Sequence, residues 1–176
     1  MSMENKTNFI IAVRGYKKTG QQKRANCTDI TALDNMNNKV LLRIIEPQDN
    51  EYITGNDIKD LIEFVKSENY DKTILVSKKF TDHAVEEMTK ENIQLVSDDY
   101  MPPFEIEELY LAIVNCANNQ CQKKCGKVQS SIFECTENNS HLCRIKALAD
   151  SAKAHFEDGS VGLLKNDLKV ALAIDK

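Results

Sequence analysis

The hydrophobic positions of this chain change their spacing along its length, and each spacing predicts a different element. Three early segments each predict a strand: residues 8–13, which are apolar and rich in Ile and Val, and residues 27–33 and 39–46, which a short turn joins. The asparagines of residues 34–38 favour a turn, because Asn tolerates left-handed backbone angles. We therefore expect a β-meander at the front of the chain, ending at Pro47, which cannot donate to a ladder.

The middle of the chain alternates between helical and strand spacing. Apolar residues recur at helical spacing over residues 56–68, where Thr54 or Asn56 can cap the helix, and over residues 81–90, where Thr81 can cap it. Short apolar runs at residues 73–77 and 93–97 predict buried strands. Helices and strands that alternate with short links are typical of parallel crossover units. We therefore expect a mixed α/β sheet in which a meander joins a parallel half.

Two consecutive prolines, Pro102 and Pro103, interrupt this pattern and predict a domain boundary. The helices predicted beyond them cover residues 104–114, 142–156 and 163–174. The expected organisation is an α/β core over residues 1–101, with a mixed central sheet flanked by helices. A helical, cysteine-rich extension over residues 102–176 is expected to pack on that core.

The charge of the chain limits its partners. A formal net charge of -4 argues against broad affinity for nucleic acid, because such affinity comes from counterions released by many Lys and Arg side chains. Locally, however, residues 14–24 carry five basic side chains and no acidic one. They are Arg14, Lys17, Lys18, Lys23 and Arg24. This segment predicts either a contact with nucleic-acid phosphates or a solvated, lysine-rich hairpin.

The apolar runs are too short for a membrane span. None approaches the ~20 residues that cross a bilayer, and residues 1–8 lack the pattern of a secretory signal. The sequence therefore predicts a cytoplasmic protein without membrane contact. In a reducing compartment, cysteines more often bind metal or lie buried than form disulfides.

Two stretches of the sequence match a known pattern. The first is Asp29-Ile-Thr-Ala, followed by a turn and by residues 40–46; the second runs over residues 72–100 and contains a Phe-Thr turn. Together they resemble the restriction-endonuclease-like superfamily, particularly its Mrr-type members, over about residues 8–100. The resemblance implies that fold, a DNA or RNA partner, and a metal-dependent nuclease site on the first strand pair.

The residues at that site depart from the family pattern. Two carboxylates on adjacent strands bind a hard cation such as Mg²⁺, which activates water, while a lysine two residues after the second acid offsets charge. Residues two apart on a strand share a face, so the acid and lysine positions fall on Ile44 and Glu46. Arg43 points to the opposite face and cannot replace the lysine.

The catalytic candidates are therefore Asp29 and Glu46, which could still hold Mg²⁺ across the hairpin. In the structural alternative, Glu46 is a solvated carboxylate at a strand end and Asp29 pairs with a backbone group or an arginine. The missing lysine predicts a protein that binds nucleic acid with absent or weak phosphodiester cleavage.

Five of the six cysteines fall within one short region near the C-terminal end. The candidate zinc ligands are Cys121, Cys125, Cys135 and Cys143. His141 is an alternative ligand, and the glycine after Cys125 is typical of turns around zinc-bound thiolates. The spacings do not follow the paired x2 pattern of zinc signatures, so disulfides and free thiols remain open. Cys27 lies far away and is expected to be a small core residue.

Two other classes of function fit the sequence. One is a module that binds another protein through the cysteine region or the acidic stretch of residues 98–108. The other is metal or redox sensing through the cysteines. The sequence identifies neither a substrate nor a particular partner.

Overall fold

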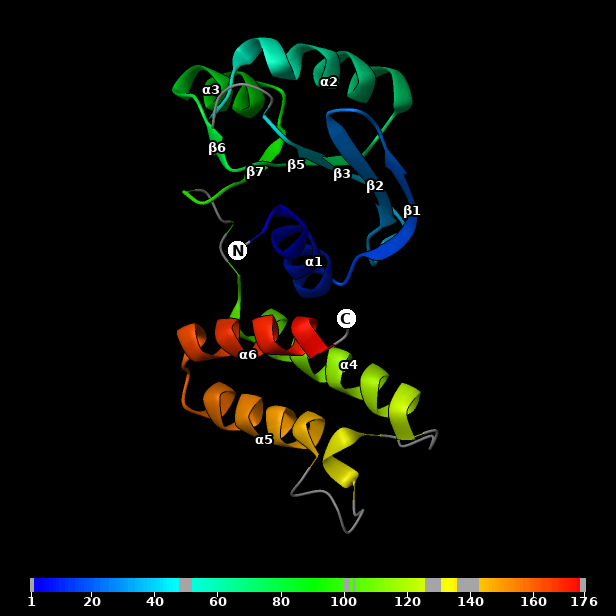
Figure 1. The fold of residues 1–176 in the computed structure, drawn as a ribbon, viewed down its shortest axis with the longest axis vertical. Coiled ribbons are helices and arrows are strands. Elements are labelled where there is room, and N and C mark those ends of the chain that lie inside the picture. Colours follow the sequence, from blue (N-terminus) through cyan, green and yellow to red (C-terminus); the bar gives the residue numbers. More distant parts are fainter. Residues whose placement is uncertain are drawn as a thin grey trace. The chain divides into compact units, whose positions relative to one another are not determined.

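A computed structural model of the chain shows its fold (Figure 1). The structure describes residues 2–47, 52–99, 102, 104–125, 131–135 and 143–174. The chain divides into two compact units. The first comprises Met1–Ile11 and Gly15–Pro103, and the second comprises Ala12–Arg14 and Phe104–Lys176. The sequence prediction placed the division after residue 101, and its further claim that the extension packs on the core stays a prediction.

Within the described residues, the first unit is built on a five-stranded mixed sheet of order β1-β2-β3-β5-β7. The strands are β1 (Lys17–Lys23), β2 (Cys27–Leu33), β3 (Lys39–Ile45), β5 (Lys72–Val76) and β7 (Gln94–Val96). The first three pair antiparallel, and β5 and β7 continue the sheet in parallel with β3. A small second sheet pairs β4 (Tyr52–Ile53) with β6 (Lys79–Phe80). The predicted α/β fold, a meander joined to a parallel half, is confirmed.

Helices cover both faces of this sheet (Figure 1). The helices α2 (Gly55–Glu68) and α3 (Asp82–Lys90) lie on one face, and α1 (Met3–Arg14) begins on the other. On the α2 face, Leu41 and Leu75 of the central strands pack in one cluster with residues of both helices. Because β3 is buried on both faces, its sequence is a continuous apolar run rather than an alternating one.

The ends of α2 and α3 follow the predicted caps. The N–H and the hydroxyl of Thr54 both donate to Asp57 Oδ2 at 2.7 Å, so Thr54 rather than Asn56 caps α2. The hydroxyl of Thr81 accepts a hydrogen bond from Ala84 N at 3.3 Å and caps α3.

The first predicted strand was wrong, because residues 8–13 belong to helix α1. A short run of Ile and Val does not separate a strand from a buried helix. The burial pattern does separate them, since Phe9, Ile10 and Val13 are buried at helical spacing. Gly15 then ends the helix with φ +64°, a conformation that costs glycine little.

The turn between β2 and β3 is held by the carboxylate of Asp34. It accepts hydrogen bonds from Met36 N and Asn38 N at 2.9 Å each, and from Lys72 Nζ at 2.7 Å. The hydrogen bond from Lys72, followed by those from Asn38, lowers the pKa of Asp34 well below its usual range. Asn37 adopts φ 62°, as predicted for an asparagine of this turn.

We expect Asp34→Asn to reduce the acid dependence of stability. Because the folded pKa lies below the unfolded value of about 3.9, Asp34 stabilises the protein above that pH, and this contribution is lost as the pH falls through the lowered pKa. Asp34→Asn should therefore lower the free energy of unfolding at neutral pH and flatten its decline in acid. Urea unfolding over a pH series measures both effects, and a profile parallel to wild type would contradict the role of Asp34.

The second unit is helical. Its described elements are α4 (Ile106–Cys125), the 3-10 turn η1 (Ile132–Glu134), α5 (Arg144–Glu157) and α6 (Val161–Ile174). The predicted helix ending at residue 114 instead continues to Cys125, because apolar burial recurs at Leu109, Ile113, Ala117 and Cys121 with helical spacing. Within the described part of the chain, no helix has the length and apolarity to cross a membrane. The cytoplasmic location stays a prediction.

Candidate functional site

Asp29 and Arg43 form a buried ion pair at the position where the sequence predicted a metal site. The antiparallel register of β2 and β3 places Asp29 directly opposite Arg43, and their side chains are 6% and 8% exposed. Arg43 Nε donates to Asp29 Oδ1 at 2.5 Å, and Arg43 Nη2 donates to Asp29 Oδ2 at 2.8 Å. Both carboxylate oxygens are thus engaged by one guanidinium in a bidentate pair.

An aromatic side chain of α2 covers this ion pair. The Arg43 guanidinium carbon lies 4.8 Å from the Phe64 ring centroid, and that of Arg24 lies 5.3 Å from the same centroid. Arg24 Nε also approaches Asp29 Oδ2 at 3.6 Å. The negative charge of Asp29 is therefore balanced by Arg24 and Arg43. Both guanidinium groups lie against the Phe64 ring, and these cation-π contacts add to the ion pair.

The charge on Arg43 is maintained despite its burial. Burial lowers the pKa of Arg43, but the hydrogen bonds and the negative charge of Asp29 outweigh it, so the net pKa is raised. The charge of the buried Arg43 is thus maintained by its contact with Asp29.

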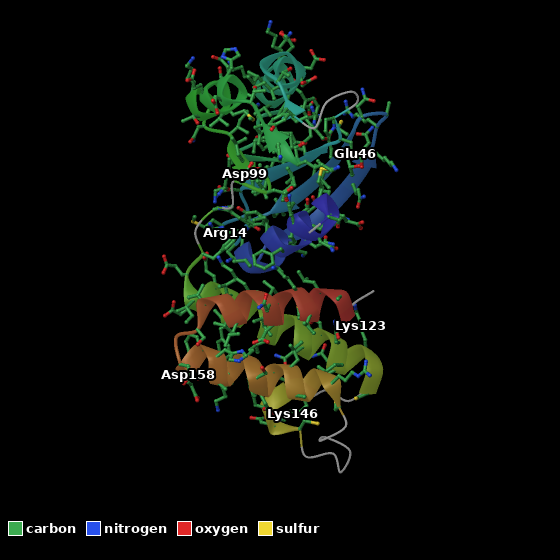
Figure 2. All side chains as sticks on the ribbon, turned by 60° about the vertical axis from the view of Figure 1, so that its left-hand side comes forward. Arg14, Glu46, Asp99, Lys123, Lys146 and Asp158 are labelled. Carbon is green, nitrogen blue, oxygen red and sulfur yellow. The ribbon has the colours of Figure 1, made fainter. Side chains whose placement is uncertain are left out.

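The strand register also separates the two predicted catalytic carboxylates. The sequence interpretation placed Asp29 on the face of Ile44 and Glu46, whereas the register pairs Ile44 with Thr28 and leaves Asp29 on the face of Arg43. Glu46 lies beyond the end of β3 and is exposed (Figure 2). The expected arrangement of Asp29 and Glu46 across the hairpin is therefore wrong. The reason is that a one-residue change of register moves every side chain to the other face.

A metal site is not preformed among the described residues. No group of three or more His, Cys, Asp or Glu side chains there could hold a metal ion. The structural alternative, in which Asp29 pairs with an arginine, is confirmed, although the sequence interpretation did not identify Arg43 as that arginine, and it missed the role of Phe64. The sequence did contain an indication that Asp29 pairs with Arg43. The length of the five-residue turn at 34–38 sets the strand register that places these two residues opposite each other.

A pocket of about 610 Å³ lies beside the end of β3. In open α/β sheets, ligands commonly bind beyond the carboxyl ends of the strands. The charged side chains that line the pocket are Arg24, Arg43, Glu46, Asp57 and Asp60. Three carboxylates and two guanidinium groups, both already in ion pairs with Asp29, do not make a phosphate-binding pocket.

The basic residues predicted to contact phosphate lie mainly on β1. This edge strand is exposed along almost its whole length, including Lys17, Lys18 and Lys23. Lys18 and Lys23 share one face, because they stand opposite Ala32 and Thr28 of β2. The Arg24 side chain follows the strand and is 45% exposed, but its Nε lies 3.6 Å from Asp29 Oδ2, so its charge is already in an ion pair.

Arg14 does not belong to this surface. It ends α1 and groups with the second unit, where its Nη1 lies 2.7 Å from Glu108 Oε1 and its guanidinium carbon 5.3 Å from the Phe104 ring centroid. The prediction that Arg14 contacts phosphate together with the lysines is corrected, because its charge is already paired with Glu108.

The six cysteines all lie within the described residues and form no disulfide with one another. Cys121 is buried and Cys125 exposed, whereas Cys135 and Cys143 are half-buried. The predicted alternative ligand His141 and the glycine after Cys125 lie outside the described residues. Cys27 is half-buried rather than a core residue and lines the pocket beside β3.

Comparison with known proteins gave one distant likeness. No family model and no curated protein matches the sequence. Among solved structures, EndoMS in its apo form is similar, with a TM-score of 0.40 and 19% sequence identity. The match covers 58% of this chain and 48% of that chain, so it spans about half the length of EndoMS. This likeness is too distant to assign a function. The function of this chain is therefore inferred from its own residues.

Proposed function

We propose that this protein binds nucleic acid through strand β1 and does not cleave it. The observation that carries the proposal is the exposed edge strand β1, which carries Lys17, Lys18 and Lys23 without an acidic residue among them. Lys and Arg side chains bind the phosphate backbone of DNA or RNA by releasing counterions, without reading sequence.

The ion pair of Asp29 supports binding without catalysis. A hard cation such as Mg²⁺ needs free carboxylate oxygens, and both oxygens of Asp29 accept hydrogen bonds from Arg43. The positive charge of Arg43 next to this carboxylate also repels a metal cation. Phosphodiester cleavage that depends on metal at Asp29 is therefore disfavoured.

The binding should be weak and sensitive to salt, because the whole chain is acidic. The affinity then comes from a few local contacts and falls steeply with ionic strength. Lysines on an edge strand also prevent that strand from pairing with a strand of another chain. This role is the alternative explanation for the lysines of β1.

Fluorescence anisotropy with labelled DNA and RNA separates the two explanations. The variant Lys18→Gln/Lys23→Gln should bind more weakly, and the slope of log K against log salt should decrease by about 1.4–1.8, or about 0.7–0.9 for each lost phosphate contact. The matched control Lys59→Gln/Lys169→Gln removes the same charge from exposed positions elsewhere and should bind like wild type. Equal weakening by both variants, or no binding by wild type at low salt, would contradict the proposal.

We also expect no cleavage of DNA or RNA when Mg²⁺ or Mn²⁺ is added. The assay incubates the full chain with labelled single- and double-stranded substrates and resolves the products on denaturing gels. Cleavage that is abolished by Asp29→Ala in a folded variant would overturn the non-catalytic part of the proposal while leaving the binding surface intact.

A further inference from the structure

Three side chains of strand β1 form a row on one face of the sheet edge. Lys18, Gln21 and Lys23 stand opposite alternate residues of β2, so all three side chains lie on the same face. All three are exposed, and β1 is the outermost strand on its side of the sheet (Figure 1). We call these three side chains the β1 row; it places an amide between two positive charges.

An irregularity of the strand produces this row. The register between β1 and β2 shifts between Lys18 and Gly20, so Thr19 is an extra residue of β1, as in a β-bulge. The hydroxyls of Thr19 and Thr31 are hydrogen-bonded at 3.1 Å, and a Cβ added at Gly20 would lie 2.9 Å from Thr31 Oγ1. Thr31 therefore fits closely against the shifted strand. Without the extra residue, strict alternation would place Lys18 on the opposite face from Lys23.

The length of the β1 row matches the width of the major groove of B-form DNA. The partners of Lys18 and Lys23 on β2 are Ala32 and Thr28, which corresponds to about 13 Å along an antiparallel strand. The major groove is about 12 Å wide and admits a β-ribbon, whereas the minor groove is only about 6 Å wide. Each lysine can thus contact the phosphates of one wall of the major groove, while Gln21, midway between them, faces the base edges.

Two considerations disfavour other nucleic acids as the partner of this row. Strand β1 contains no aromatic residue, whereas proteins that bind single strands commonly stack the bases on aromatic side chains. The major groove of an A-form RNA helix is too deep and narrow for side chains to read. Duplex DNA is therefore the nucleic acid that the β1 row fits.

We propose that β1 enters the major groove of duplex DNA and that Gln21 reads an adenine there. This inference rests on the proposed binding of nucleic acid by the lysines of β1, and it names the kind of nucleic acid. Lys18 Nζ donates a hydrogen bond to Gln21 Oε1 at 2.5 Å. When Lys18 turns to a phosphate, Gln21 Oε1 can accept from adenine N6 while Nε2 donates to adenine N7, a bidentate contact that distinguishes adenine from the other bases.

The neighbouring Gln22 provides a matched control. It is the same residue type and is also exposed, but it stands opposite Asp29 and so lies on the other face of β1. Gln22→Ala should therefore keep the base preference that Gln21→Ala loses. Both positions are exposed on an edge strand, so neither substitution removes a buried contact.

Selection of duplexes from a library with randomised base pairs tests the proposal. We expect wild type to select a position with adenine and to bind a duplex with G·C at that position about 5-fold to 100-fold more weakly. In fluorescence anisotropy, Gln21→Ala should bind the two duplexes equally. Its salt dependence should remain that of wild type, because Lys18 and Lys23 still contact the phosphates.

Several outcomes would overturn the reading of adenine in duplex DNA. They are a wild type without base preference, a preference that Gln21→Ala keeps or that Gln22→Ala also loses, and equal affinity for single-stranded DNA or duplex RNA. Binding that still depends on Lys18 and Lys23 would in these cases leave the proposed function standing. No binding of any nucleic acid at low salt would overturn the proposed function as well.

Discussion

Asp29→Ala is expected to lower the free energy of unfolding by about 3–5 kcal/mol. The substitution leaves the Arg43 guanidinium charged, with its side chain only 8% exposed and its bidentate partner gone. A carboxylate kept for catalysis behaves differently, since removing it commonly leaves stability unchanged or raises it. Chemical denaturation of the wild type and the variant at neutral pH measures the difference.

Two further variants make this prediction specific. Glu46→Ala removes the other predicted catalytic carboxylate, which is exposed, and should change the free energy of unfolding by no more than about 0.5 kcal/mol. The double variant Asp29→Leu/Arg43→Met removes both buried charges together and should recover most of the loss. If Asp29→Ala were as stable as wild type, the ion pair would not be structural and a metal site at Asp29 would again be favoured.

Leu168→Ala on α6 should lower the free energy of unfolding of the second unit by about 2–5 kcal/mol. Leu168 is fully buried within this unit, so truncation removes apolar contacts and leaves a cavity. The same substitution at Leu163, on the same helix but 47% exposed, should change stability by no more than about 0.5 kcal/mol. The two variants thus compare the effect of the same Leu→Ala substitution on stability at a buried and at an exposed position.

The same variant tests whether the two units are independent in stability. If they are, calorimetry of Leu168→Ala should show an early transition for the second unit and an unchanged one for the first. Hydrogen exchange should then show lost protection in α4, α5 and α6 while the strands keep theirs. A single transition that shifts as a whole would contradict this independence.

Local signals in the sequence located several elements accurately. The bounds of β2 were predicted together with the Asn-rich turn that follows it. Thr81 was predicted to cap α3, and Thr54 was one of two caps predicted for α2. These signals depend on neighbouring residues, so they do not need the rest of the fold. The strand predicted at residues 8–13 failed for the complementary reason, because a short apolar run is buried equally well in a helix.

The candidate site shows more clearly that local sequence patterns do not determine contacts between distant residues. The residue types alone were enough to locate an aspartate on β2, an absent lysine on β3, a run of basic side chains without acids, and a cluster of cysteines. They did not establish which side chains meet. In the tertiary structure, Asp29 pairs with Arg43 and Phe64 covers that pair. Arg14 forms an ion pair with Glu108 instead of joining the lysines. These contacts depend on strand register and on helices distant in sequence, and a register shift of one residue would have exchanged Arg43 for Ile44.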